Sequence, residues 1–255
     1  MKPTVWDMHV HLDFMNDANT IVNEADELGI GLYAVTVTPQ GYEYSTRNFK
    51  RRDNLRICVG LHPWWAADGR CGPEDALHAA DLIRETRFIG EIGLDSSPKH
   101  VPAGSLPVQL SAIRTICGAC TGSAGSEAPK ILSIHSVRAA GLIMDVLEEY
   151  GCLRNCRCIF HWFTGSSDEL NRAIRSGCMF SVNEMMLNTR RGREYARQIP
   201  EDRLLLETDL PPGEHIPFTA ARILESLERT LDILKTIRGR DMRAVTCGNS
   251  ERVLS

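Results

Sequence analysis

The stretch ILSIH at residues 131–135 combines two features that decide the fold: an almost unbroken apolar run and a polar residue at its end. A short run of this kind, without alternation of polar and apolar residues, is typical of a strand buried on both faces in a parallel sheet. Seven other segments have the same character. They are VWDMH (5–9), GLYAVTV (31–37), ICVGLH (57–62), FIGEIG (88–93), CIFHW (158–162), MFSV (179–182) and LLLET (204–208).

Segments with helical spacing of apolar residues lie between these eight strands. One ends at Gly29, one opens at Pro73, and a long one carries Ala220, Ile223, Leu227, Leu231 and Leu234 on one face. A doubly wound sheet would have fewer strands and a Gly-rich turn after the first, and the chain contains no G-x-G-x-x-G. The alternation therefore predicts an α/β fold, a (β/α)8 TIM barrel, and at 255 residues a single domain spanning 1–255.

Composition limits the environment of the protein. No apolar run approaches the 18 or more residues of a membrane span, and the first residues have neither a charged leader nor an apolar core of a signal peptide. Nine cysteines, an odd number, fit reduced thiols in the cytoplasm better than a disulfide framework. Cys117-x2-Cys120 and Cys152-x3-Cys156-x-Cys158 are possible zinc motifs, but neither has a matching second half, so we favour reduced thiols.

The net charge of -4 argues against general electrostatic adhesion to nucleic acid, although it allows a local site. Of the 29 basic residues 24 are arginine, whose planar fork suits phosphate oxygens. Two runs, Arg51-Arg52 and Arg190-Arg191-x-Arg193, are either solvated faces or phosphate contacts, and the sequence leaves both interpretations open.

Polar residues gather at the carboxyl ends of the predicted strands, where barrel enzymes build their active sites. His9 and His11 alone would be ambiguous, because histidine often packs without a ligand. Five of the eight histidines lie at predicted strand ends, and the remaining three, His78, His100 and His215, fall in predicted helices or loops. The strand-end residues, in chain order, are His9, His11, His62, Glu91, Asp95, His135, His161 and Asp209.

Such a set can hold two divalent cations if one carboxylate bridges them, and Glu91, from the middle of the chain order, is the expected bridge. Two cations would polarise a phosphoryl oxygen and hold a hydroxide between them, which predicts phosphoester hydrolysis. Asp209 would ligate one metal and accept the proton of the attacking water. Magnesium, manganese and zinc all remain open as the metal. The predicted ligands are His9, His11, Glu91, His135, His161 and Asp209.

Three residues beside this set are assigned to the substrate. His62, in GLHPWW, is placed to contact a phosphate or is a structural histidine. Trp64 stacks on a base or packs against the barrel. Asp95 contributes to the substrate pocket by orienting a ligand, or it caps the next segment.

The blocks WDMHVHLD, GLHPWW, GEIGLD, SIHSVRAA, FHWFTGS and LLETDLPP, with GNSERVL at the end, resemble the signature blocks of the TatD family of metal-dependent deoxyribonucleases. The resemblance runs from residue 6 to 254 and implies a TIM-barrel hydrolase of the amidohydrolase type with two divalent metals, often an exonuclease on DNA. Carried over by residue, it implies the same six ligands and a phosphate-contacting His62. Two segments depart from the family pattern, Ser96-Ser97-Pro98 and Gly213-Glu214-His215, and both leave the substrate open.

The start WDMHVHLDF, the FHWFTGS block and the compact length look most like the TatD-type nucleases of Qat anti-phage defence systems, which implies possible partner proteins from a defence operon. Three other functions stay open. One is a cyclic-amide hydrolase or deaminase, although its usual strand-four lysine is replaced by Glu91. The second is hydrolysis of an aminoacyl-tRNA ester, and the third is a nucleic-acid-sensing subunit of a defence complex.

Overall fold

The computed structural model describes residues 2–121, 128–213 and 216–255. The described chain forms two compact units. Of the described residues, the first unit comprises 2–35, 44–57, 180–213 and 216–255, and the second unit comprises 36–43, 58–121 and 128–179. Two elements are divided between the units by this partition, α2 (Pro39–Asn48) and β7 (Met179–Val182). The organisation of the chain as one domain over 1–255 stays a prediction.

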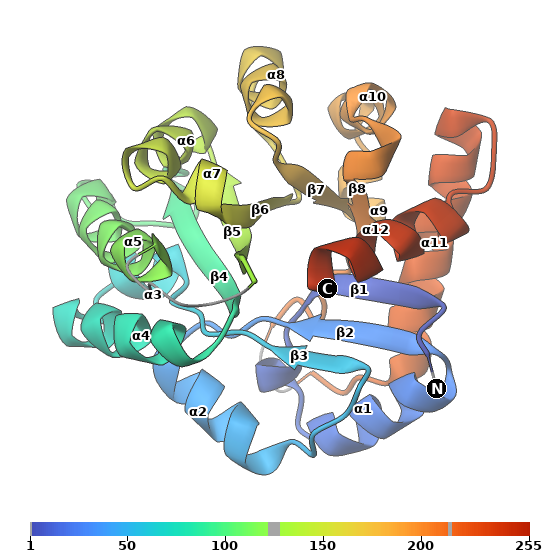
Figure 1. Cartoon of the computed structure of the whole chain (residues 1–255), viewed down its shortest axis with the longest axis horizontal. Coiled ribbons are helices and arrows are strands. Elements are labelled where there is room, and N and C mark those ends of the chain that lie inside the picture. Colours follow the sequence, from blue (N-terminus) through green and yellow to red (C-terminus); the bar gives the residue numbers. More distant parts are fainter. Residues whose placement is uncertain (1, 122–127, 214–215) are drawn as a thin grey trace. The chain divides into compact units, whose positions relative to one another are not determined.

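The strands of the first unit are parallel. β2 (Ile30–Ala34) pairs with β1 (Val5–Val10) on one side and with β3 (Leu55–Ile57) on the other, and β7 pairs with β8 (Leu204–Leu206) (Figure 1). Just beyond β8 the chain lies against β1, because the Asp209 N–H donates to the His9 carbonyl at 2.9 Å. The other elements of this unit are η1 (Leu12–Phe14), α1 (Ala18–Glu27), α9 (Glu184–Leu187), α10 (Arg190–Gln198), η2 (Glu201–Arg203), α11 (Ala220–Arg238) and α12 (Arg243–Leu254).

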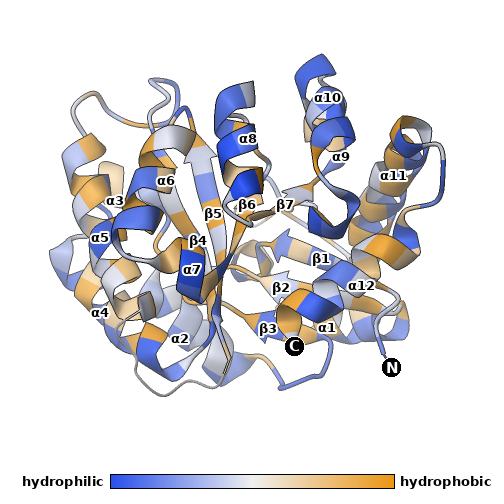
Figure 2. Ribbon diagram, turned by 45° about the horizontal axis from the view of Figure 1, so that its top comes forward, coloured by the Kyte–Doolittle hydropathy of each residue, from blue (hydrophilic) through white to orange (hydrophobic). Residues whose placement is uncertain are grey.

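Helices α11 and α12 hold this sheet through different chemistry. In Figure 2, α11 shows both hydrophobic and hydrophilic bands, and its apolar residues Ile223, Leu227 and Leu234 are buried. Each such side chain contributes about 1.5–3 kcal/mol by leaving water. Helix α12 adds a polar contact to its buried apolar residues, because the Asn249 amide donates to the carbonyl of Leu204 at 2.8 Å. The start of β8 is thereby fixed.

The second unit is built on three long parallel strands in the order β4 (Phe88–Asp95), β5 (Lys130–Val137) and β6 (Cys156–His161). The segment 58–61 lies beside β4 without forming a regular strand: Val59 bridges to Ile89, and the Leu61 N–H donates to the Glu91 carbonyl at 3.0 Å. The helices of this unit are α3 (Pro63–Ala67), α4 (Pro73–Glu85), α5 (Leu106–Thr121), α6 (Ala140–Glu149), α7 (Cys152–Asn155) and α8 (Ser167–Arg175).

Two glycines let the backbone come close around Glu91. A Cβ on Gly60 would lie 1.6 Å from the Thr36 carbonyl oxygen, and one on Gly93 would lie 2.0 Å from the His135 carbonyl oxygen. Gly93 also has φ +145°, which a residue with a side chain rarely adopts. Only glycine therefore allows β4 to approach β5 closely at this level.

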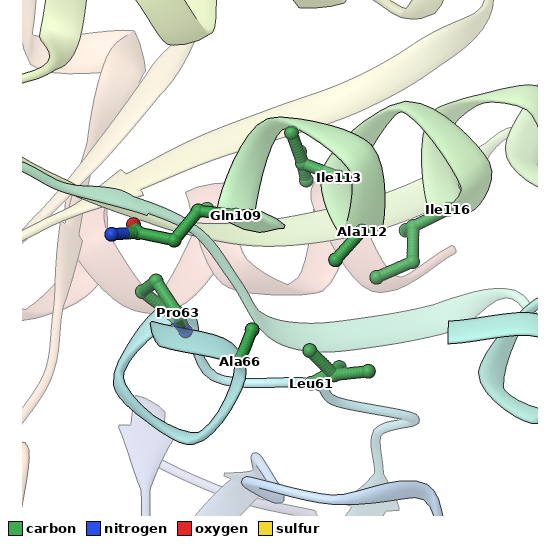
Figure 3. Close-up of a pocket in the computed structure, with 8 residues that line it drawn as sticks. Leu61, Pro63, Ala66, Gln109, Ala112, Ile113 and Ile116 are labelled. Carbon is green, nitrogen blue, oxygen red and sulfur yellow. The ribbon is translucent and has the colours of Figure 1, made fainter. Parts of the chain in front are cut away.

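Helix α5 supports the end of β4. The Gln109 side-chain oxygen accepts from the Asp95 N–H at 2.9 Å, and its amide donates to the Asp95 carbonyl at 3.0 Å. Figure 3 shows Gln109 and Ile113 of α5 lining a small cavity together with Pro63 and Ala66 of α3. The short helix that follows His62 therefore packs against the same helix that holds Asp95.

The eight strand segments predicted from the sequence are present, with changes at their ends. Prediction placed a strand at 57–62, where the regular strand ends at Ile57, and extended the last strand to 208, where it ends at Leu206. The segments 94–108 and 120–129 are rich in Pro, Gly and Ser, which predicts loops. The first contains the beginning of α5, and residues 122–127 of the second lie outside the described residues. Among the described helices, none is long and apolar enough to cross a membrane.

Candidate metal centre

The second unit gathers three imidazoles around one carboxylate at the carboxyl ends of its strands. One oxygen of Glu91, Oε1, lies 2.8 Å from His135 Nδ1, 2.9 Å from His161 Nε2 and 3.1 Å from His62 Nε2. All four residues are buried, and Glu91 is only 2% exposed. We call Glu91, His62, His135 and His161 the Glu91 cluster. A buried carboxylate in such a shell needs cations or hydrogen-bond donors around it, which the rings supply.

Local structure fixes the orientation of the His62 ring. His62 is the N-cap of α3, and its Nδ1 accepts the Trp64 N–H at 3.1 Å. Because Nδ1 is an acceptor, the ring proton lies on Nε2 and points at Glu91. His62 thus lies within reach of the same carboxylate as His135, and His62, Glu91 and His135 offer ligand atoms within 4.8 Å of one another.

Asp95 is the second acid of β4 and is completely buried. Its Oδ2 lies 3.0 Å from His135 Nε2, accepts the Trp64 indole N–H at 2.7 Å and lies 2.9 Å from His100 Nδ1. Its Oδ1 accepts the Ser97 N–H at 2.7 Å. Burial raises the pKa of Asp95, but its hydrogen bonds with His135, Trp64 and Ser97 outweigh burial and hold the pKa well below the usual range.

His135 therefore lies between two carboxylates. Burial lowers its pKa, whereas the hydrogen bonds to Asp95 and Glu91 raise it, and the net shift is upward. Asp95 holds one ring nitrogen while the other faces Glu91, as expected for a carboxylate that orients a metal-binding imidazole. This geometry favours the orienting role of Asp95. Trp64 is half-buried with its N–H engaged, and its ring packs 4.9 Å from that of His62 and 5.0 Å from that of His100.

The first unit holds a separate group of predicted ligands, which we call the Asp209 cluster: His9, His11 and Asp209. Asp209 Oδ1 lies 3.7 Å from His9 Nε2 and 3.5 Å from His11 Nε2. His9 and His11 lie at the end of β1, and backbone bonds from Asp209 to His9 and from His11 to Leu210 align the chain after β8 with β1. The Asp209 side chain keeps 22% exposure, so water can reach it.

Two further buried acids lie at the base of the Asp209 cluster. Asp7 is fully buried and accepts hydrogen bonds from the Thr208 hydroxyl, from the Thr208 N–H at 3.0 Å and from the His9 N–H at 3.2 Å. Burial raises the pKa of Asp7 to about 8 against these hydrogen bonds. Glu207 accepts from the Ser181 hydroxyl and, at 2.9 Å, from the Asn183 amide. These contacts fix the backbone immediately before Asp209.

Positive φ angles mark the strand ends of both units. The non-glycine residues with positive φ in the described chain are Arg138 (52°), Trp162 (37°) and Asp209 (57°). Arg138 and Trp162 follow strands that carry a predicted ligand, and Asp209 is itself a predicted ligand after β8. Side-chain-bearing residues rarely adopt this conformation, which costs about 1–3 kcal/mol and is most common at functional sites. We therefore infer that the unusual backbone of the turns after β5, β6 and β8 serves to position the side chains at these turns.

Both clusters fit divalent cations by their chemistry. Each combines imidazole nitrogens with carboxylate oxygens, the ligand types that zinc and manganese accept, and holds them close together. All of these side chains are buried except Asp209, which is partly exposed. The His62–Glu91–His135 group shows that His62 also lies where a ligand could. The assignment of all six predicted ligands to two metals stays a prediction.

Sequence reasoning overlooked three contributors to this arrangement. His100 was placed in a loop without a role, yet its ring contacts Asp95. Asp7 and Glu207 lie inside the predicted apolar strands 5–9 and 204–208 and have no predicted role. The available signal for those two was an acidic residue inside a strand buried on both faces, which needs buried partners. No local pattern marks His100. The sequence segment Glu214–His215, which departs from the family pattern, lies outside the described residues.

Parallel strands with helices between them and imidazole–carboxylate clusters at their carboxyl ends define the class of metal-dependent α/β-barrel hydrolases. The chain belongs to the TatD related DNase family, whose model matches residues 6–255. The predicted hydrolase acting on ester bonds is confirmed by this membership. The family assignment made from the sequence blocks is confirmed as well, whereas the Qat association stays a prediction.

The chain aligns with most of the length of several relatives. The chain is 28% identical over 229 residues to "Deoxyribonuclease Tat-D" of Schizosaccharomyces pombe, covering 83% of this chain and 69% of that protein. It is 27% identical to "3'-5' ssDNA/RNA exonuclease TatD" of Dickeya dadantii, covering 86% of this chain and 83% of the relative. An "Uncharacterized metal-dependent hydrolase" of Escherichia coli is 25% identical, over 97% of this chain and 94% of the relative.

Solved structures confirm the predicted TIM-barrel fold class. A TatD family hydrolase from Entamoeba histolytica matches with a TM-score of 0.76 at 17% identity, covering 99% of this chain and 98% of that one. A TatD homologue from Escherichia coli K12 matches with the same TM-score at 18% identity and the same coverage.

Proposed function

We propose that this protein is a metal-dependent phosphodiesterase that hydrolyses nucleic acid as a DNA exonuclease. The observation that carries the proposal is the Glu91 cluster, in which one buried carboxylate oxygen has three imidazole nitrogens within 3.1 Å. Such a carboxylate is suited to hold cations between its neighbours. The names of two relatives, a deoxyribonuclease and an ssDNA/RNA exonuclease, support nucleic acid as the substrate.

In this proposal two divalent cations, magnesium, manganese or zinc, are held by His9, His11, Glu91, His135, His161 and Asp209. The inclusion of both clusters in one centre rests on the barrel fold, in which the carboxyl ends of all strands open on one face. When bound, the cations act as Lewis acids on the phosphoryl oxygen and neutralise developing charge.

The side chains divide the remaining work. Asp209, whose side chain is partly exposed, accepts the proton of the attacking water. Asp95 holds the His135 ring in position through Nε2. His62, with its proton on Nε2, donates to a phosphate oxygen of the substrate or remains on Glu91. Trp64, beside His62, offers an aromatic face next to the phosphate.

The finer assignments are part of the same proposal. A role in anti-phage defence beside partner proteins from a defence operon rests on the sequence blocks quoted above. The cytoplasm as the site of action rests on the nine cysteines, which form no disulfide in the described structure. Ester hydrolysis on aminoacyl-tRNA and nucleic-acid sensing without turnover are the competing functions, and assays distinguish both.

The test compares Glu91→Gln with wild type and with Glu74→Gln, an exposed control from the same unit. Each protein is assayed with magnesium, manganese and zinc on labelled single-stranded DNA, RNA, charged tRNA and bis(p-nitrophenyl) phosphate. We expect Glu91→Gln to lose at least about a hundredfold of the hydrolysis rate, because several kcal/mol of charge stabilisation disappear. Activity on charged tRNA alone, or full activity of the variant, would refute the proposal.

A further inference from the structure

Three arginines lie in the first turn of α10 in the first unit: Arg190, Arg191 and Arg193, which we call the arginine patch. All three are exposed. Among the residues that the structure describes, no carboxylate lies within ion-pair distance of their guanidinium groups. The nearest acid along the helix, Glu194, is engaged elsewhere, because it accepts from Arg197 at 2.7 Å and from Gln198 at 2.8 Å. The patch therefore presents net positive charge to solvent.

This placement opposes the stability of the helix. The N-terminus of a helix carries partial positive charge, so a cation there is unfavourable by about 0.3–1 kcal/mol, and α10 has no acidic residue in its first turn. Arg190 and Arg193 also stand three residues apart, where like charges repel. The N-cap Thr189 accepts the Gly192 N–H at 2.9 Å and offsets part of this cost. An anion would relieve the repulsion, and the helix N-terminus attracts anions as well.

The position of the patch relates it to the Asp209 cluster. Arg190 follows the end of β7 by eight residues, β7 pairs in parallel with β8, and Asp209 follows the end of β8 by three residues. The carboxyl ends of parallel strands lie at one edge of their sheet, so the chain leaves β7 for α10 at the edge where Asp209 stands. The other run, Arg51-Arg52, precedes β3 and lies at the amino end of its strand. The topology thus places the arginine patch at the carboxyl edge of the sheet and Arg51-Arg52 at the amino end of a strand. The sequence alone did not show which of the two runs lies nearer to the predicted site.

We infer that the arginine patch binds the phosphate backbone of the nucleic acid strand beyond the phosphodiester being cleaved. This inference rests on the proposed function. Three exposed guanidinium groups contact successive phosphates and release their counterions, which holds a polymeric strand at the carboxyl edge of the sheet. A substrate with a single phosphodiester cannot use the patch, so the chain discriminates in favour of polymers. The overall charge of -4 leaves this local patch to supply the attraction.

The test is the salt dependence of binding to single-stranded DNA 20-mers, measured with Arg190→Gln/Arg191→Gln/Arg193→Gln. The control is Arg51→Gln/Arg52→Gln, which removes exposed arginines at the amino end of the same unit's sheet. Binding is measured by fluorescence anisotropy in the Glu91→Gln background, so that no strand is cleaved. We expect the slope of log K against log salt to fall in magnitude by about 2 in the triple variant, since each lost phosphate contact removes about 0.7. The control keeps the starting slope.

Cleavage assays add a second comparison. We expect the triple variant with Glu91 intact to lose at least about tenfold more kcat/KM on the 20-mer than on bis(p-nitrophenyl) phosphate, because only the polymer reaches the patch. An unchanged slope in the triple variant, or an equal fall in the control, overturns the inference even when DNA is hydrolysed. If wild type hydrolyses no oligonucleotide but the slope still falls by about 2, the proposed function fails and the binding role of the patch stands.

Discussion

At the scale of single residues, Asp95 is the acid on which the position of His135 depends. Its Oδ2 faces three ring nitrogens, from Trp64, His100 and His135, while Oδ1 accepts the Ser97 N–H. No single orientation of an asparagine can accept on both sides, because its amide nitrogen is a donor only. A neutral isostere would therefore leave at least one buried donor without an acceptor.

We expect Asp95→Asn to lower the free energy of unfolding by about 1–3 kcal/mol, the usual cost of an unsatisfied buried polar group. Metal affinity should fall about 10–100-fold, because the orienting contact on His135 is lost. Thermal denaturation and titration with manganese measure the two effects. Asp232→Asn, at an exposed position, is the control. Unchanged metal affinity in Asp95→Asn would show that Asp95 does not orient His135.

The residues of the candidate site differ in how far they could be predicted from sequence. His9, His135 and His161 stand directly at the ends of apolar runs. The end of such a run can be recognised from composition, so these three residues could be predicted from the sequence. His100 does not, because its contact with Asp95 depends on the path of the loop after β4. The path of a loop depends on tertiary packing. Here it depends on the two hydrogen bonds between the Gln109 side chain and the Asp95 backbone, and a local sequence pattern does not reveal such contacts.

At the scale of elements, α8 begins with a reciprocal cap that fixes the segment after β6. The Ser166 hydroxyl accepts the Glu169 N–H, the Glu169 carboxylate accepts the Ser166 N–H at 2.7 Å, and the same carboxylate accepts the Gly141 N–H of α6 at 2.6 Å. One acid thus caps its own helix and ties it to the neighbouring helix.

We expect Ser166→Ala to lower the free energy of unfolding by about 1 kcal/mol, within the 0.5–2 kcal/mol that capping residues usually contribute. Ser167→Ala is the matched control, since this exposed serine is the first residue of α8 and makes no cap. Urea denaturation followed by circular dichroism compares the two. Equal stability of the two variants would contradict a contribution from the Ser166 cap.

Element types were easier to predict than element ends for a physical reason. β5 is an apolar run in a fully buried strand, and burial selects its residues directly. The segment 58–61 is similarly apolar, but it forms an isolated bridge to Ile89 and a bond from Leu61 to Glu91 in place of a regular strand. At Gly60 its backbone lies close to the carbonyl of Thr36. Apolar composition indicates that a segment is buried, which predicts the element type. Where a strand begins and ends depends on backbone hydrogen bonds to neighbours that are distant in sequence.

At the scale of the whole molecule, the chain passes between the two compact units four times, after residues 35, 43, 57 and 179. Neither unit is a continuous stretch of sequence, and α2 and β7 contribute residues to both. Because each unit combines segments that are distant in sequence, neither unit can form from one continuous piece of the chain. The single domain over 1–255 stays a prediction, and its unfolding tests it.

We therefore expect one cooperative unfolding transition. Circular dichroism follows all helices, and tryptophan fluorescence follows Trp6 of the first unit together with Trp64, Trp65 and Trp162 of the second. Coincident urea curves from both probes are expected for a two-state domain. Two separated transitions would show that the units are independent domains and would contradict the prediction for 1–255.

Metal binding gives the last test of the whole molecule, because a cation that binds only the native state stabilises it. At a free concentration of 100 times Kd the gain is about 2.7 kcal/mol, which raises Tm by roughly 5–10 °C for a chain of this length. Removal of the metal with EDTA reverses the increase. In our proposal Glu91 of the second unit and Asp209 of the first serve one binuclear centre. Glu91→Gln and Asp209→Asn should then each remove most of the increase, and the double variant should lose little more, because residues of one centre are not additive. If each variant removes half and the double variant removes the sum, the two clusters bind their cations independently.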